Sequence, residues 1–264
     1  MAALKDDASQ IAKYSPMEGH RCEGEEQCGM HINCCNANGP RAFALIPDFA
    51  VKKMGNEVYV NYYGDMSASL ENGHNKVLVK QHTTYPVSNV IDITIDVTKE
   101  NVFGLHLRVP VWSAQTVITL NGEELKDICP GTYHAITRKW KKGDHIQIIL
   151  DMPARLLEQN QMQAIVRGPI VLARDSRFND GFVDETLVVD SEDGIVKAEV
   201  DSVPGFAWMR LKVPVTVGTD LEGVGMYRNI SFCDFASAGN TWDKQVRYRV
   251  WIPRTLDVKK GHLK

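Results

Sequence analysis

Two adjacent cysteines, Cys34 and Cys35, are the residues of this sequence whose type and placement best suit chemistry. A thiolate is both a strong nucleophile and a soft metal ligand, and zinc deprotonates a bound thiol near neutral pH. The residues that follow predict a helix, with Asn38 as its cap and Pro40 at its first position. Because a helix start favours negative charge, it would stabilise a thiolate just ahead of it. From the residues alone, the pair is either a metal-binding or nucleophilic pair or two inert structural cysteines.

The other cysteines add little to this choice. Cys22 and Cys28 precede the pair at five-residue intervals, which do not match the two-residue spacing of common zinc fingers. Cys129 and Cys233 stand alone, and we expect them to be small buried or half-buried residues. Further candidate ligands or acids near Cys22 and Cys28 are Glu23, Glu25, Glu26 and His31. We interpret that polar stretch as a solvated loop.

The composition excludes several classes of partner. The chain has 264 residues, of which 44% are hydrophobic and 24% are charged, enough for one large or two modest globular domains. A formal net charge of -3 gives no reason to expect nucleic acid or an anionic membrane. No apolar run approaches the roughly 20 residues that span a bilayer. Glycine-rich patterns that hold a nucleotide are also absent from the sequence.

The period of the hydrophobic pattern changes at Gly55. Before it, Phe43, Ile46 and Phe49 recur at helical spacing, and Pro47 is expected to end the helix within about three turns. After it, short alternating segments are separated by turn sequences, with no further helix between them, which predicts antiparallel sandwiches. The predicted strands are EVYVNYY, KVLVKQHT, VIDITIDV, FGLHLRVP, TVITLNG, YHAIT, HIQIIL, AIVRGPIVLARD, TLVVD, IVKAEV, AWMRLKV, NISFCDF and QVRYRVWIP.

One ordered series of segments resembles a known family. The stretch CCNANGPRAFALIPDFAV, followed by EVYVNYY, is similar to a junction in bacterial β-L-arabinofuranosidases of glycoside hydrolase family 127. The series continues in the expected order and covers about residues 29–254. Its further matches are VKQHTTYP, LHLRVPVWS, ITLNGE, YHAITRKWKKGDHIQIILDMPAR, AIVRGPIVLARD and YRVWIPR.

The resemblance implies a mainly β fold. Members of the family have an amino-terminal (α/α) barrel that bears the active site, followed by two β-sandwiches. We therefore expect two antiparallel, jelly-roll-like sandwich modules after a short helical remnant of the barrel. Residues 1–50 would be the remnant, 51–154 with 242–264 the first sandwich, and 155–241 a second sandwich inserted into the first.

The resemblance also implies a retaining glycoside hydrolase that acts on an arabinose-containing, plant-type glycan. Cys34 would be the nucleophile and a zinc ligand, and Cys35 a second zinc ligand. The family's acid/base Glu, and the Glu and Cys that complete its zinc site, lie well upstream of the pair. Only 33 residues precede Cys34. We therefore expect a missing amino-terminal barrel domain as partner, an incomplete zinc site and an inactive fragment, in the bacterial cytoplasm or the periplasm.

Two other functions stay open at this point. One is a non-catalytic carbohydrate-binding or structural β module, and the other is a small zinc-binding interaction protein. Arg41 could contact a sugar hydroxyl, although it equally suits a surface or packing role. We interpret the tryptophans as sandwich core or interdomain packing rather than a sugar-stacking platform, and we assign the strand histidines no site. These residues are Trp112, Trp140, Trp208, Trp242, Trp251, His82, His106, His134 and His145.

Overall fold

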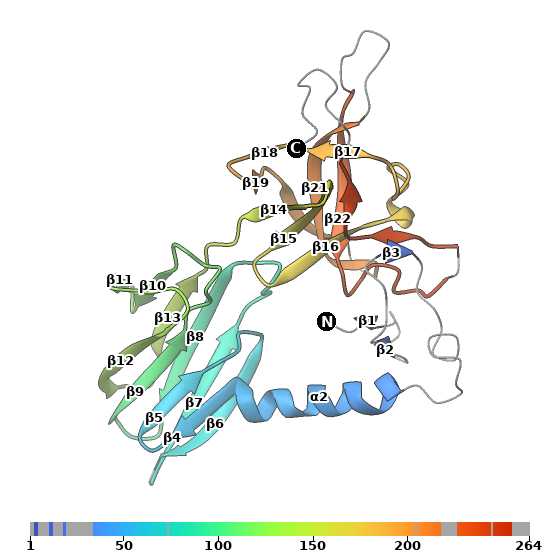
Figure 1. Ribbon diagram of the computed structural model, residues 1–264. Coiled ribbons are helices and arrows are strands. Elements are labelled where there is room, and N and C mark those ends of the chain that lie inside the picture. Colours follow the sequence, from blue (N-terminus) through green and yellow to red (C-terminus); the bar gives the residue numbers. More distant parts are fainter. Residues whose placement is uncertain are drawn as a thin grey trace. The chain divides into compact units, whose positions relative to one another are not determined.

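The computed structural model describes residues 34–72, 74–203, 205–217, 226–243 and 245–254, with three short strands nearer the amino end (Figure 1). Those strands are β1 (Ala3–Leu4), β2 (Ile11–Ala12) and β3 (Glu18–Gly19). The chain divides into two compact units. One unit is Arg41–Met152, and the other combines Met1–Pro40 with Pro153–Lys264. The described part of the chain is mainly β, as predicted, and its α-helix is α2 (Cys34–Ala50).

Helix α2 is longer than the sequence predicts. It begins at Cys34, so Asn38 and Pro40 lie inside it rather than at its start. It also continues through Pro47 to Ala50, because a proline removes only its own N–H from the helical ladder. The last carbonyls find partners in the following strand region: Asn61 donates its backbone N–H to Ala50 O at 2.8 Å and its side-chain amide to Phe49 O at 2.7 Å. The helix therefore ends where its terminal acceptors are satisfied.

The first unit is a sandwich of two sheets, as predicted. One sheet has the order β11-β10-β13-β8-β7-β6 and the other β12-β9-β5-β4. Pairing is antiparallel except between β5 and β9, which run parallel. The strands are β4 (Val51–Met54), β5 (Glu57–Val60), β6 (Met66–Asn72), β7 (Asn75–His82), β8 (Val90–Val97), β9 (Asn101–Arg108), β10 (Val117–Leu120), β11 (Glu123–Glu124), β12 (Tyr133–Trp140) and β13 (Asp144–Ile149).

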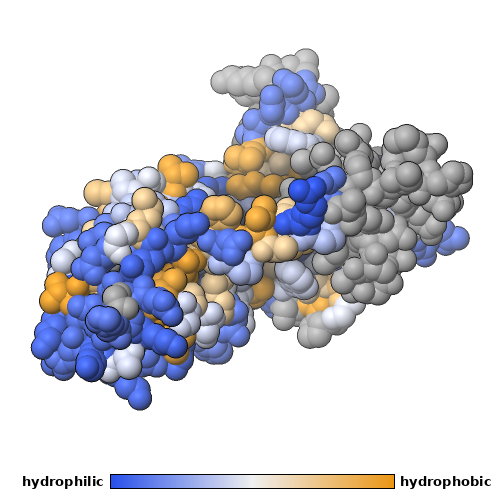
Figure 2. Space-filling view, turned by 90° about the horizontal axis from the view of Figure 1, so that it is seen from below, coloured by the Kyte–Doolittle hydropathy of each residue, from blue (hydrophilic) through white to orange (hydrophobic). Residues whose placement is uncertain are grey.

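Alternation along the strands builds the core of this sandwich. In β8, every second residue from Ile91 to Val97 is buried, and the residues between them are half-buried. These side chains join those of Val58, Leu105 and Trp140 in one hydrophobic cluster. Hydrophilic side chains cover much of the described surface, with apolar residues between them (Figure 2). The described part of the chain contains no helix with the length and hydrophobicity needed to cross a membrane.

The second unit is built on one connected, twelve-stranded sheet. Its main path is β17-β21-β22-β16-β15-β14-β19-β18, and β20 pairs with β21. Ala173, Cys233, Phe235 and Tyr248 belong to a buried cluster of this unit. The elements are β14 (Ala154–Gln159), β15 (Met162–Arg167), β16 (Ile170–Asp175), the 3-10 helix η1 (Ser176–Phe178), β17 (Leu187–Val189), β18 (Ser191–Glu192), β19 (Ile195–Val196), β20 (Glu199–Val203), β21 (Ala207–Val217), β22 (Met226–Asp234), β23 (Tyr248–Arg249) and β24 (Ile252–Pro253).

The expected return of the last strand to the first sandwich is wrong. Strand β23 pairs with β16, and β24 pairs with β15, so both complete the second unit. The reason lies in the hairpin of β15 and β16, whose strands pair with each other at only two positions each before their other residues take different partners. Alternation in residues 248–252 shows that one face is buried, but it does not specify which sheet the strand joins. The second sandwich is therefore not an insertion that ends at residue 241.

This pairing predicts the effect of a truncation. Deleting residues 245–264 removes β23 and β24, and it leaves edges of β15 and β16 without partners. We expect amide hydrogen exchange to speed up in β15 and β16 and to stay slow in β8 and β9. Deleting only residues 255–264 is the control, because it keeps both strands. Loss of protection in β8 and β9, with β15 and β16 unchanged, would contradict the assignment.

Candidate functional site

The predicted nucleophile, Cys34, and its neighbour Cys35 are the first two residues of α2. They therefore lie in the first helical turn, not ahead of it. The N–H groups of this turn have no partner within the helix, and they carry the positive end of the helix dipole. No acidic side chain occupies the turn. A helix start of this kind favours a negatively charged group in or just ahead of its first turn.

The cysteine pair has the right donors for zinc but supplies only half of a four-ligand site. The structure describes the backbone of residues 34–37, and their side chains are outside the described part. The neighbouring candidates lie entirely outside the described residues: Cys22, Cys28, Glu23, Glu25, Glu26 and His31. Among the side chains that the structure describes, no three His, Cys, Asp or Glu residues come together as a metal would require.

Helix α2 presents its apolar side chains to solvent. Phe43, Leu45, Ile46 and Phe49 are 43–53% exposed, although their spacing predicts a buried face. Arg41 is exposed on the same helix. The helix that carries the cysteine pair thus has a row of half-exposed apolar residues. In a folded protein such a row is ordinarily covered by another element or domain.

The strand histidines lie apart and each faces at most one carboxylate. His106 Nε2 lies 2.7 Å from Glu57 Oε2, and its ring stacks on Tyr59 with the centroids 4.2 Å apart. His145 and His82 each lie 3.1 Å from an aspartate, Asp92 and Asp65 respectively. Burial lowers the pKa of His134. These pairs hold strands and turns of the first sandwich together.

The tryptophans divide into packed and exposed residues. Trp140 and Trp242 are buried, and Trp112 and Trp251 pack against the two cores. Trp208 is different, because 71% of it is exposed. Trp208 is therefore not part of a sandwich core, and its packing against another domain stays a prediction. The signal was present in the alternation of AWMRLKV, which sets Trp208 on the outer face of β21 with the polar residues at 210 and 212. The expectation for Cys129 is also wrong, because it is exposed.

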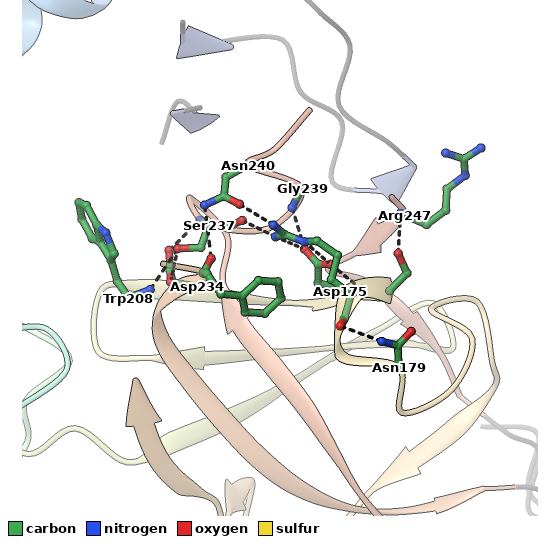
Figure 3. A network of polar contacts seen from close by, with 11 residues as sticks. Asp175, Asn179, Trp208, Asp234, Ser237, Gly239, Asn240 and Arg247 are labelled. Carbon is green, nitrogen blue, oxygen red and sulfur yellow. Dashed lines mark hydrogen bonds and ion pairs between the residues drawn. The ribbon is translucent and has the colours of Figure 1, made fainter. Parts of the chain in front are cut away.

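An ion pair between the buried Asp175 and the half-buried Arg177 anchors the loops around Trp208 (Figure 3). The Arg177 guanidinium donates to both carboxylate oxygens of Asp175, at 2.6 and 2.9 Å, and to Asn240 Oδ1 at 2.7 Å. Asp175 also accepts the backbone N–H of Gly239 at 2.7 Å. The guanidinium lies 4.2 Å from the ring centroid of Phe206, two residues before Trp208. One charge pair thus ties η1 to the loop after β22 and to the start of β21.

A second carboxylate fixes the backbone of Trp208 itself. Asp234 accepts the N–H of Met209 at 3.2 Å and the hydroxyl of Ser237 at 2.8 Å. The same Ser237 oxygen accepts the backbone N–H of Trp208 at 3.2 Å. Asp234 and Ser237 are buried, whereas the indole of Trp208 points away from the network (Figure 3). The side chain is therefore exposed on a backbone that is rigidly held.

The outer face of β20, β21 and β22 continues from Trp208 as a polar surface. Arg210 donates to Asp201 of β20 at 2.8 Å, and this bond lowers the pKa of the Asp201 carboxyl. A cavity of about 400 Å³ lies further along the face. Its lining residues are Lys197, Ala198, Glu199, Lys212, Pro214 and Asn229. Sequence reasoning named none of the polar residues, although the alternation of β21 places Arg210, Lys212 and Pro214 on one face.

A family model matches part of the chain. Residues 57–152, which run from β5 to the end of the first unit, match the model described as "Beta-L-arabinofuranosidase, GH127 middle domain". No curated protein matches the sequence. The resemblance to family 127 enzymes is thus confirmed where the first sandwich lies.

Solved structures of this family share the fold. The chain is similar to a GH127 β-L-arabinofuranosidase from Geobacillus stearothermophilus T6, with a TM-score of 0.78 and 18% identity over 96% of this chain and 44% of that one. It is also similar to a GH127 β-arabinofuranosidase, with a TM-score of 0.77 and 20% identity over 96% and 43% of the two chains. A further glycoside hydrolase gives 0.71 and 22% over 86% and 40%. The chain spans less than half the length of each of these proteins.

The ion pair of Asp175 and Arg177 gives a stability prediction. Replacing Asp175 with Ala leaves the Arg177 charge without its carboxylate, and we expect a loss of about 1.5–3 kcal/mol in the free energy of unfolding. Chemical denaturation of the variant measures this loss. The control is Glu124→Ala, which removes an exposed ion pair with Lys126 and should change stability by less than about 1 kcal/mol. Equal effects of the two variants would contradict the anchoring role.

Proposed function

We propose that this chain, which carries a GH127 middle domain, is the carboxy-terminal part of a retaining glycoside hydrolase of β-L-arabinofuranosidase type. The observation that carries the proposal is the cysteine pair in the first turn of α2, directly ahead of that domain. Cys34 is the nucleophile in this proposal, and Cys34 and Cys35 are two ligands of a zinc ion. The substrate is an arabinose-containing, plant-type glycan.

The proposed reaction uses the Cys34 sulfur in two steps. The thiolate attacks the anomeric carbon, so that a C–S bond forms and the glycosidic C–O bond breaks. The leaving oxygen takes its proton from a carboxylic acid on a domain that precedes the cysteine pair. The resulting carboxylate then deprotonates a water, whose oxygen attacks the same carbon, and the C–S bond breaks to return the thiolate. Two displacements at one carbon retain its configuration.

Zinc, when bound, lowers the pKa of its thiol ligands and thus supplies the thiolate. The two cysteines fit such a role through their chemistry and their place at the helix start. They leave two ligand positions for residues outside the described part. The half-exposed apolar row of α2 supports the same partner, a helical barrel domain that covers Phe43, Ile46 and Phe49 and contributes the acid and the other ligands.

Activity tests the nucleophile. In a protein that includes the helical domain, Cys34→Ala should lower kcat/KM on an aryl β-L-arabinofuranoside by about 10³-fold or more. Cys129→Ala is the matched control, because this exposed cysteine has no part in the mechanism. The 264-residue chain alone should stay at background, since loss of the proton donor removes about 10²–10⁴ in rate. Turnover by the chain alone that depends on Cys34, or full activity of Cys34→Ala, would contradict the proposal.

Metal content tests the ligands. Two thiols hold zinc weakly, so we expect less than one zinc per purified 264-residue chain and tight binding only with the helical domain present. Elemental analysis of both proteins, each with and without Cys35→Ser, measures this. One tightly bound zinc per 264-residue chain that disappears in Cys22→Ser and Cys28→Ser would show instead a local four-cysteine site.

A further inference from the structure

We propose that the outer face of β20, β21 and β22 is a glycan-binding surface that takes a chain of neutral sugars. It uses none of the residues of the proposed catalytic mechanism. The inference rests on the proposed function only for the source of the glycan, an arabinose-containing polymer, and not for the site.

The first argument is the exposed indole of Trp208. A sugar ring carries apolar C–H groups on its faces, and these stack favourably on a flat aromatic side chain. With 71% of its surface exposed, Trp208 leaves its indole open to such stacking. The bonds of the Trp208 and Met209 N–H groups to Ser237 and Asp234 hold the backbone before a ligand arrives. Binding to this platform therefore costs little further ordering.

The second argument is the polar surface that continues from Trp208. Residues 208, 210, 212, 214 and 216 share one face of β21. Register places Asp201 opposite Arg210, Glu199 opposite Lys212, and Asn229 opposite Pro214. The face thus offers N–H donors and carboxylate and amide acceptors side by side, with a cavity of about 400 Å³ between them. Sugar hydroxyls, which both donate and accept, match this mixture.

A second exposed aromatic side chain lies at the other end of this face. Tyr227 is 76% exposed and pairs with Thr216, eight residues along β21 from Trp208. At about 3.4 Å per residue, the two aromatics are roughly 27 Å apart along the strand. This length suits an extended chain of several sugar rings and exceeds a single monosaccharide.

Charge favours a neutral ligand over an anionic one. Arg210 is paired with Asp201, and Lys197 lies 2.9 Å from Glu192. Lys212 lies opposite Glu199 in the register. A nucleic acid or an acidic polysaccharide would meet these carboxylates as well as the cations, so the face provides no net attraction for phosphate or uronate groups. Among the described residues of this face, large exposed apolar side chains lie at its two ends, unlike the apolar centre of a protein interface.

Binding to the 264-residue chain tests the surface. The probes are neutral arabino-oligosaccharides, with xylo- and manno-oligosaccharides beside them, measured by isothermal titration calorimetry and tryptophan fluorescence. We expect binding by at least one series, a change in tryptophan emission, and a loss of about tenfold or more in affinity for Trp208→Ala. Tyr62→Ala is the matched control, because this half-exposed tyrosine lies in the other unit and should leave the affinity unchanged.

Two further variants keep the outcome clear. Trp208→Phe retains an aromatic platform and should keep most of the affinity, and Asn229→Ala should lower it a few-fold. Unchanged circular dichroism and melting temperature show that a loss of binding is not a loss of fold. No binding by any of the three series, or equal binding by wild type and Trp208→Ala, would overturn the inference.

The same panel separates this inference from the proposed function. Trp208-dependent binding, together with no arabinofuranosidase activity when the helical domain is present, would support the surface and reject the enzyme. Activity on arabinofuranosides without Trp208-dependent binding would do the reverse. Trp208-dependent binding of xylo- or manno-oligosaccharides alone supports the surface and contradicts arabinose as its source.

Discussion

Strand β16 holds the second unit together, because it pairs in turn with three different strands. Its first residues pair with β15, its middle residues with β22, and its last residues, Arg174 and Asp175, with β23. The strand ends in Asp175, whose buried carboxylate binds Arg177 and the Gly239 N–H. Without this pair, the loop after β22 would lose the Gly239 bond to Asp175, and the half-buried Arg177 guanidinium would lose its carboxylate. The Arg177 guanidinium also lies over the ring of Phe206, which connects the same ion pair to the start of β21.

That constraint explains why the unit can present a large aromatic side chain to water. Exposed indoles on mobile loops would find apolar partners by local rearrangement. Here the N–H groups of Trp208 and Met209 are fixed by Ser237 and Asp234, which are themselves buried. With the backbone fixed, the alternation of β21 places the Trp208 side chain on its outer face. The buried side chains of Ser237 and Asp234 thus fix the strand whose outer face carries Trp208.

The sequence predicted the strands well because each carries its own evidence, alternation between turn residues. The VIDITIDV pattern of β8 is buried at every second position, as the periodicity requires. Prediction from the sequence failed where the pairing of a strand depends on residues far away in the chain. Alternation in residues 248–252 could not tell which sheet lacked a strand, and that depended on how β15 and β16 diverge. The start of α2 was missed because Pro40 resembles a first-turn residue, although it lies in the seventh helical position. The prediction for Trp208 gave more weight to the usual packing of tryptophan than to the alternation of β21, which places this side chain on the outer face.

The cysteine pair and the face between Trp208 and Tyr227 would act on the same glycan in different ways. A displacement by the Cys34 sulfur acts on one anomeric carbon, so it needs close positioning of a single terminal sugar. A strip roughly 27 Å long between Trp208 and Tyr227 contacts many sugars weakly and has no influence on which bond breaks. Holding a polymer on such a strip raises the effective concentration of its chain ends near the rest of the protein. It would thus lower KM for a long glycan while leaving kcat unchanged, since binding of remote sugars is the same before and during the reaction. A short aryl glycoside has no further sugars to place on this face, so substrate length distinguishes the contribution of the face from that of Cys34.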